Sequence, residues 1–422
     1  MTPLWLGLDI GTSGVRAAVV DRSGAVVSAV RVPLDRRPLG PGEDANAWWS
    51  AARECLVRQT EALDDPSRLV AMAIDGTSGS MVMVDGGGVP VGAALRYDTK
   101  GFDAEAERIG CHAPEGSITR GAGSALARFL RLASNAPASA RLAHEADFVV
   151  AQLTRAVGVS DESNALKTGW DAEARQWPDW FAAAGVPMEA LPRVVPVGEP
   201  MGTVGAGAAC ETGLPEGLRV VAGTTDSVAA FLAAGSVAPG TAVTSLGTTL
   251  ALKIVSPVRI EDASRGVYSH RVGDAWIAGG ASNVGGGTIA MHFTADEVAA
   301  LTPRLDPERD TGLDYVPLPR PGERFPVADA GLAPRLEPRP DDDAEFLQGM
   351  LEGIARTERN GYRTLEALGA PYPTRVLTAG GGARNGAWAA IRARMLGVPV
   401  EPSPEAEASV GMARLALSRV PA

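Results

Sequence analysis

The chain is poor in cysteine, histidine and aromatic residues. Its 422 residues include 3 cysteines, 4 histidines and only 5% aromatic side chains. Cys55, Cys111 and Cys210 lie far apart, and the histidines show no ligand spacing with them or with each other. This pattern argues against a disulfide scaffold and against a structural zinc site. We therefore expect a protein of a reducing, cytoplasmic compartment.

Basic clusters and long apolar runs are also missing. The 50 acidic and 39 basic residues leave a formal charge of −11, with no Lys/Arg cluster to follow a phosphate backbone. Nucleic acid is therefore not an expected partner. Residues 1–5 lack the basic segment of a signal peptide, and Asp9 interrupts the apolar run that follows. The longest stretch of small apolar residues, 226–254, is broken by Asp226, Pro239 and several glycines, so no membrane span is predicted.

The composition that is present is typical of a folded α/β protein. Apolar residues make up 45% of the chain and charged residues 21%, as in globular domains. The 50 glycines and 31 prolines are scattered singly, which indicates many short loops. A single hydrophobic core rarely grows beyond roughly 250–300 residues, so a chain of this length predicts two domains with a cleft.

Two turns made of glycine and threonine each follow an apolar, strand-like run. The first turn, residues 11–14 of the segment 9–14, follows the run 5–8, and the second, residues 247–249 of the segment 246–249, follows the run 241–245. Such turns expose backbone N–H groups and small hydroxyls without a bulky side chain to exclude an anion. They predict phosphate contacts at Thr12, Ser13, Gly247, Thr248 and Thr249.

A third glycine-rich loop, residues 378–385, follows the apolar run 375–377. Its bare backbone would allow the close approach of a flat nucleoside. In this interpretation Gly381, Gly382, Asn385 and Trp388 form an adenosine slot; in a plainer one they are a helix entrance and a packing residue. With the two turns, the loop predicts that two halves of the protein hold a nucleoside triphosphate. P-loop and dinucleotide-binding motifs are both lacking.

Two carboxylates lie at the ends of strand-like runs beside these loops. Asp9 could hold Mg²⁺ through water, because Mg²⁺ keeps most of its hydration shell, or it could simply form a turn. Asp226, which stands alone at the end of its strand, could cap a helix. A cap needs only Ser or Asn, however, whereas a proton acceptor for a hydroxyl in phosphoryl transfer needs a carboxylate. Thr77 and Ser78 could cap a turn, but their hydroxyls would also suit a polyol.

The remaining patterns predict two similar sets of strands about 236 positions apart, which indicates duplication of one domain plan. Residues 100–215 receive no detailed assignment beyond a helical stretch at 122–133.

The expected elements are a meander of strands over 4–32, a helix over 47–63 begun by Asp44–Asn46, strands over 69–74 and 80–84, a helix from 227, strands over 240–246, 250–255, 266–271 and 276–279, a long ordered loop over 303–343, and helices from 343 and over 386–395.

At these residues the chain resembles the FGGY family of carbohydrate kinases, in the superfamily of actin, hexokinase and the heat-shock chaperone ATPases. The similarity covers nearly the whole chain. Within the family the chain is most similar to the short xylulose-kinase-like enzymes of cyanobacteria and plants that are regarded as D-ribulose kinases. Segments 7–14, 75–79, 223–226, 247–249 and 380–385 carry the family resemblance, and segments 266–270, 280–283, 312–315 and 322–326 carry the closer one.

The resemblance implies an α/β fold with two actin/hexokinase-like (ribonuclease-H-like) domains around a central cleft. Residues 1–233 and 407–422 would form a sugar-binding domain, and residues 234–406 a nucleotide-binding domain. ATP and Mg²⁺ would be the cofactors. Asp226 would be the catalytic base and contact the sugar together with Asp9 and Ser78, Asp9 would also lie by the metal, and Thr12 by the phosphates.

The expected reaction is phosphorylation of a terminal hydroxyl of a ketopentose, D-ribulose to D-ribulose 5-phosphate. D-Xylulose, L-ribulose and a pentitol remain open, because segment 96–100 stands where many family members carry a tryptophan-containing sugar motif. Two further alternatives are a sugar-independent actin-like ATPase and a non-catalytic sugar-binding protein. The expected partners are a small sugar and ATP, with the chain a monomer or a homodimer.

Overall fold

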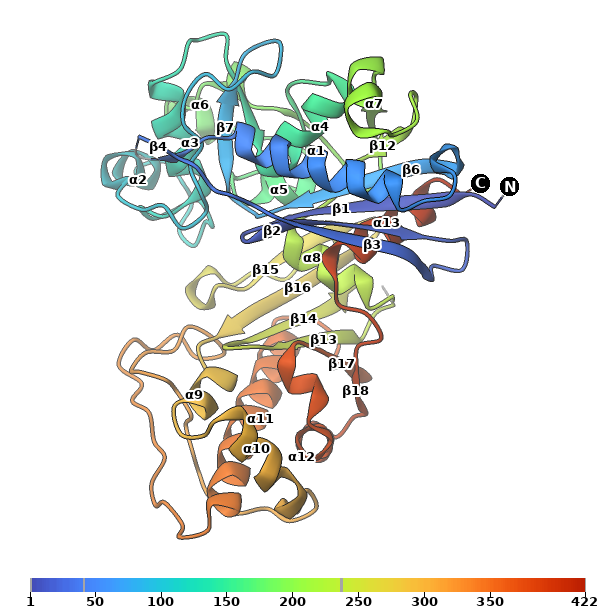
Figure 1. Ribbon diagram of the computed structural model, residues 1–422. Helices are drawn as coiled ribbons and strands as arrows, with labels where there is room; N and C mark the ends of the chain where they lie inside the picture. The colour runs from blue at the N-terminus through green and yellow to red at the C-terminus, as the bar shows by residue number, and fades with distance from the viewer. Residues whose placement is uncertain (1, 41, 236–237, 422) are drawn as a thin grey trace. The chain divides into compact units, whose positions relative to one another are not determined.

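The computed structural model describes residues 2–40, 42–235 and 238–421 and divides them into two compact units. Unit 1 contains residues 2–40, 42–235, 270–273 and 407–421, and unit 2 contains residues 238–269 and 274–406. Residues 234–235 and 270–273 thus group with unit 1, outside the domain predicted for them, and chain ends 1 and 422 lie outside the described residues. Both units combine a six-stranded sheet with helices (Figure 1).

Unit 1 is built on a mixed sheet with the strand order β11-β12-β6-β1-β2-β3. β1 (Leu4–Gly11), β2 (Gly14–Val20) and β3 (Val26–Pro33) form the predicted antiparallel meander. β6 (Leu69–Gly76) runs parallel to β1, and β12 (Arg219–Val221) runs parallel to β6. All eight residues of β1 are buried, as expected for a central strand covered on both faces.

Helices cover this sheet from both the middle and the end of the chain. α1 (Asn46–Glu61) buries Trp48, Ala52, Cys55 and Leu56 and packs on β2 and β3. Its N-cap is Ala45, and the side chain of Asp44 accepts from the N–H of Asn46. The remaining elements of unit 1 are β4 (Pro38–Leu39), β5 (Gly42–Glu43), β7 (Met81–Val84), α2 (Asp103–Gly110), α3 (Ala125–Ser134), β8 (Arg141–His144), α4 (Glu145–Thr154), β9 (Val159–Asp161), α5 (Glu162–Leu166), α6 (Trp180–Ala183), β10 (Arg193–Val195), β11 (Pro200–Thr203), α7 (Ala206–Thr212), α8 (Asp226–Ala233) and α13 (Ala408–Arg419).

The last helix, α13, lies directly against the first strand and against α8. A Cβ atom added to Gly7 would lie 1.9 Å from the carbonyl oxygen of Ser409, and one added to Gly411 would lie 1.9 Å from that of Ala229. Only glycine permits this backbone approach. The C-terminal segment therefore completes unit 1 and supports the helix that begins with Asp226.

Unit 2 repeats the strand arrangement of unit 1. Its sheet has the order β15-β16-β14-β13-β17-β18, where β16–β14 and β14–β13 are antiparallel and β13–β17 and β17–β18 are parallel. The run β3-β2-β1-β6-β12 has the same succession of pairings in unit 1, so the predicted repetition of one set of strands is confirmed. The strands are β13 (Thr241–Leu246), β14 (Leu250–Ser256), β15 (Tyr268–Val272), β16 (Ala275–Ser282), β17 (Arg375–Ala379) and β18 (Val400–Pro402).

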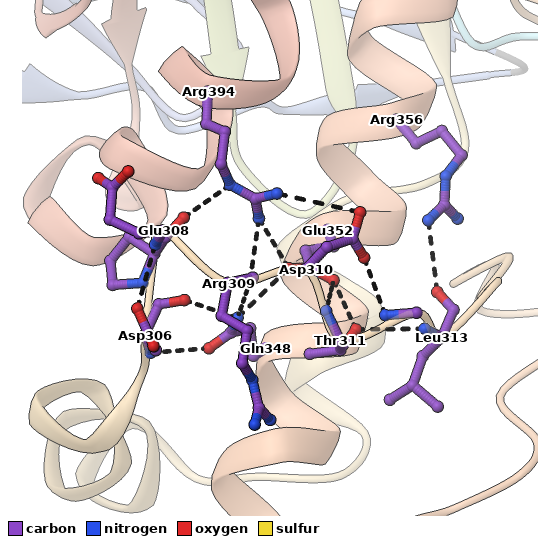
Figure 2. Close-up of polar contacts among 12 residues, drawn as sticks. Asp306, Glu308, Arg309, Asp310, Thr311, Leu313, Gln348, Glu352, Arg356 and Arg394 are labelled. Carbon is purple, nitrogen blue, oxygen red and sulfur yellow. Dashed lines mark hydrogen bonds and ion pairs between the residues drawn. The ribbon is translucent and has the colours of Figure 1, made fainter.

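The helices of unit 2 hold a long segment, residues 305–342, in place. These helices are α9 (Gly286–Ala290), α10 (Ala295–Leu301), α11 (Asp343–Ala367) and α12 (Gly386–Leu396). Figure 2 shows the buried Glu352 of α11 accepting from Arg394 of α12 at 2.8 Å and from the hydroxyl of Thr311 at 2.5 Å. Gln348 exchanges two hydrogen bonds of 2.8 Å with the backbone of Asp306. The predicted ordered loop is therefore fixed by side chains of the helix that follows it.

Among the described residues, no helix has the length and apolar character needed to cross a bilayer.

Candidate functional site

The first glycine-threonine turn joins β1 to β2 and presents its tip to solvent. Thr12 and Ser13 are exposed, whereas Asp9, two residues before the turn, is 3% exposed. The guanidinium of Arg16 on β2 donates to Asp9 Oδ2 at 2.8 Å. The turn therefore combines an exposed tip with a buried acid and a half-buried base directly behind it.

Asp75 on β6 lies beside Asp9 in the parallel register of the two strands. It is fully buried, and neither of its carboxyl oxygens accepts a hydrogen bond from the part of the chain that the structure describes. Burial, together with the nearby carboxyls of Asp9, Asp226 and Glu145, raises the pKa of Asp75 well above its usual range.

Asp226 is the first residue of α8, and Thr225 occupies the N-cap position. The plainer interpretation of Asp226 as a helix cap is therefore wrong. Its description as a lone carboxylate is also wrong, because its charge contributes to the raised pKa of Asp75. Asp226 Oδ1 accepts from the N–H of Ser227 at 2.6 Å, and the side chain is only partly buried. The acid thus belongs to a group of carboxyls that β1, β6 and α8 bring together.

Around this carboxyl group several buried polar atoms lack hydrogen-bond partners among the described residues. They are the hydroxyls of Ser78, Thr224 and Thr225 and the amide oxygen of Asn164, besides both oxygens of Asp75. Thr225 bridges to Gly76, and the Asn164 amide donates to the Thr224 carbonyl at 3.2 Å, so these residues lie on adjoining segments. Buried polar groups are normally satisfied. A ligand with several hydroxyls would supply the missing partners.

The second glycine-threonine turn and the third glycine-rich loop lie together in unit 2. β13 and β17 are parallel neighbours in register, with Ser245 opposite Ala379, so both connections leave the same sheet edge. Gly247, Thr248 and Thr249 are exposed. The N–H groups of Gly286 and Gly287 donate to the carbonyls of Gly247 and Thr248 at 2.9 and 3.0 Å. The turn is thus held by the entrance of α9.

The four residues of the predicted adenosine slot take different positions. Gly381 is exposed, and a Cβ added there would meet nothing within 4 Å. A Cβ added to Gly382 would lie 2.8 Å from Leu246 Cβ and 2.9 Å from the ring of Trp388. Asn385 is the N-cap of α12: its oxygen accepts from the N–H of Trp388 at 3.0 Å, and its amide donates to Thr302 at 3.1 Å. Trp388 is 4% exposed and belongs to the core of unit 2.

The sequence pattern did not identify three residues of the site in unit 1, namely Asp75, Arg16 and Asn164. Asp75 was visible as the carboxylate near the end of its strand in the segment 75–79, as Asp9 is near the end of β1. Arg16 could have been found from the hairpin, since a tight turn at 11–14 places it opposite Asp9. Asn164 lies in the region for which the sequence pattern predicts no detail, and no periodic signal marks it.

The sheet orders and the pairing repeated in both units define a two-domain α/β protein of the actin/hexokinase class. The chain belongs to the FGGY family of carbohydrate kinases: the family's N-terminal domain matches residues 133–233 and its C-terminal domain matches residues 242–419. The predicted fold class and the predicted family are both confirmed.

Individual relatives agree with this assignment. The chain is 32% identical to the xylulose kinase of Streptomyces coelicolor over 437 residues, covering 97% of this chain and 86% of that protein. It is 24% identical to the L-fuculokinase of Escherichia coli, covering 97% and 91%. The crystal structure of xylulose kinase from Rhodospirillum rubrum has a TM-score of 0.83 at 24% identity, covering 99% of this chain and 90% of that one. Plasmodium falciparum glycerol kinase with ADP has a TM-score of 0.85 at 15% identity, with the same coverage.

Proposed function

We propose that this protein transfers the γ-phosphate of ATP to the terminal hydroxyl of a ketopentose. The observation that carries this proposal is the set of buried, unpartnered oxygen atoms of Ser78, Asn164, Thr224 and Thr225 beside Asp75 and Asp226. An ATPase that acts on no sugar gives no reason for these atoms to stay unsatisfied. In this proposal unit 1 binds the sugar and unit 2 the nucleotide.

In the proposed reaction Asp226 is the general base. Its carboxylate accepts the proton of the terminal hydroxyl while that oxygen forms a bond to the γ-phosphorus. The bond between this phosphorus and the β–γ bridging oxygen breaks, so that ADP leaves with the electron pair. The products are the sugar phosphate and ADP, and the proton passes from Asp226 to solvent. The position of Asp226 on the first turn of α8 suits this role, because its side chain is only partly buried.

Asp9 suits a magnesium ion that is held through water. Among the described residues, no group of three or more Asp, Glu, His or Cys side chains forms a direct metal site. Asp9 has one oxygen bonded to Arg16 and a buried acid beside it, which fits an outer-sphere contact. When bound, Mg²⁺ would neutralise charge on the phosphates. Thr12, Ser13, Gly247, Thr248 and Thr249 would contact these phosphates, and Gly381 and Gly382 would border the adenosine.

The expected resemblance of segments 266–270, 280–283, 312–315 and 322–326 to D-ribulose kinases supports D-ribulose as the first candidate for the sugar. The similarity to the xylulose kinase of Streptomyces coelicolor supports D-xylulose as the second candidate. The two ketopentoses differ in the orientation of one hydroxyl, which a site that hydrogen-bonds that hydroxyl can distinguish strongly.

Coupled ADP release measured with D-ribulose, D-xylulose, L-ribulose, a pentitol and glycerol tests the proposal. We expect release to depend on a ketopentose, with the largest kcat/KM for D-ribulose. A maximum at D-xylulose would select the second candidate, and release that no sugar changes would refute a sugar kinase.

A further inference from the structure

A buried ion pair between Arg36 and Glu145 lies behind the first glycine-threonine turn. Arg36, between β3 and β4, has a side chain 12% exposed, and Glu145, the first residue of α4, is fully buried. Arg36 Nη2 donates to Glu145 Oε1 at 3.2 Å. Arg36 also pairs with the carboxylate of Glu43 through Nη1. The Arg36 guanidinium is therefore part of a buried ion-pair network and not of a surface salt bridge.

The same guanidinium holds two consecutive carbonyls of the turn. Arg36 Nε donates to the carbonyl of Thr12 at 2.9 Å, and Nη2 lies 3.4 Å from the carbonyl of Gly11. In a planar trans peptide the N–H of the next residue points opposite to the carbonyl. The N–H groups of Thr12 and Ser13 are therefore turned away from Arg36, on the exposed side of the turn where an anion would sit.

Glu145 also holds the backbone of a second loop of unit 1, residues 76–78. Its Oε2 accepts from the N–H of Thr77 at 2.9 Å, one residue before Ser78. The hydroxyl of Thr77 in turn donates to the carbonyl of Ile10 at 3.2 Å, just before the turn. One ion pair thus touches the backbone of the turn 11–14 and of the loop 76–78.

We propose that Arg36 and Glu145 are positioning residues that set the phosphate turn and the sugar loop in one fixed relation. Arginine is required at position 36 because its planar fork reaches the two turn carbonyls, Glu43 and Glu145 at once, which an ammonium on a flexible stem does not. This inference rests on the proposed function for its kinetic consequence. Its structural part concerns the backbone alone.

Steady-state kinetics of Arg36→Lys, Glu145→Gln and the double variant test the proposal, with Arg37→Lys as the matched control. Arg37 is the neighbouring arginine, with a side chain 62% exposed and only a loose pair to Asp35 at 3.7 Å. Loss of charged hydrogen bonds predicts a rise of roughly tenfold or more in the KM for ATP in Arg36→Lys and in the sugar KM in Glu145→Gln. For each substrate, the rise in KM in the double variant should be smaller than the product of the rises in the two single variants, because the two residues act as a unit. Arg37→Lys should match the wild type.

Amide hydrogen exchange at residues 10–14 and 76–80 separates this inference from the proposed function. Faster exchange at both loops in Arg36→Lys supports the positioning role even if the wild type shows no sugar-dependent turnover, in which case only the proposed function fails. Unchanged exchange at the two loops, or a folded Arg36→Lys variant with lowered thermal stability but a wild-type KM for ATP, overturns the inference. If Arg36→Lys does not fold, Glu145→Gln decides by the same two readouts.

Discussion

At the scale of single residues, the carboxyls of Asp9, Asp75 and Asp226 show how the fold changes the meaning of a sequence motif. In the sequence each is an acid at the end of an apolar run, and each could form a turn or a cap. In the structure Asp9 and Asp75 are neighbours in register, and the charges of Asp9 and Asp226 both help to raise the pKa of Asp75. Local spacing identifies Asp9 and Asp226 as candidates. It does not reveal their mutual proximity, which depends on pairing between strands that are far apart in the chain.

Replacement of Asp226 by asparagine tests its role as the base. The variant keeps the shape and the acceptor of the side chain but cannot accept the proton. We expect kcat to fall by roughly 10²–10⁴-fold, the usual contribution of general-base catalysis. Nucleotide affinity, measured by calorimetry with ADP, should stay close to that of the wild type.

Asp103→Asn is the matched control for this variant. Asp103 is likewise the first residue of a helix, α2, but it is exposed. Its replacement should leave turnover unchanged. An Asp226→Asn enzyme with turnover within a few-fold of the control would remove Asp226 from the reaction.

At the scale of secondary structure, hairpins and long helices were predictable, and short elements tied by distant contacts were not. The meander over 4–32, both strand sets and the helix from Asp343 follow from apolar periodicity and turn residues, and the structure confirms them. The region 100–215 contains helices of four to ten residues and short strands with distant partners, such as β8, which pairs with β7 more than fifty residues earlier. Such elements are stabilised by tertiary packing, which leaves a weak local signal.

The loop after β17 provides a prediction at this scale. Gly382→Ala places a Cβ against Leu246 and Trp388 at 2.8–2.9 Å, whereas Gly381→Ala meets open space. Overpacking of this kind costs about 1–3 kcal/mol. Thermal unfolding without nucleotide should show a lowered midpoint for Gly382→Ala and a wild-type midpoint for Gly381→Ala. Equal midpoints for the two variants would show that the loop yields to the added methyl group and is not closely packed on β13.

At the scale of the whole molecule, the repeated topology explains why two similar turns occur about 236 residues apart. Each follows the strand that begins the antiparallel part of its sheet, β1 in unit 1 and β13 in unit 2. Their repetition made the duplicated domain plan predictable from sequence, whereas the actin/hexokinase-like fold class was implied by the family resemblance. The choice of sugar was less predictable, since it depends on buried groups such as Asn164 that no repeat or motif marks.

The central claim is that phosphate passes from ATP to a sugar hydroxyl. Phosphorus NMR of the wild-type protein with ATP, magnesium and either D-ribulose or D-xylulose, followed over time, tests it most directly. We predict a new phosphomonoester signal that grows in a one-to-one ratio with ADP. ADP formed together with inorganic phosphate alone, with D-ribulose and D-xylulose both unchanged, would contradict it.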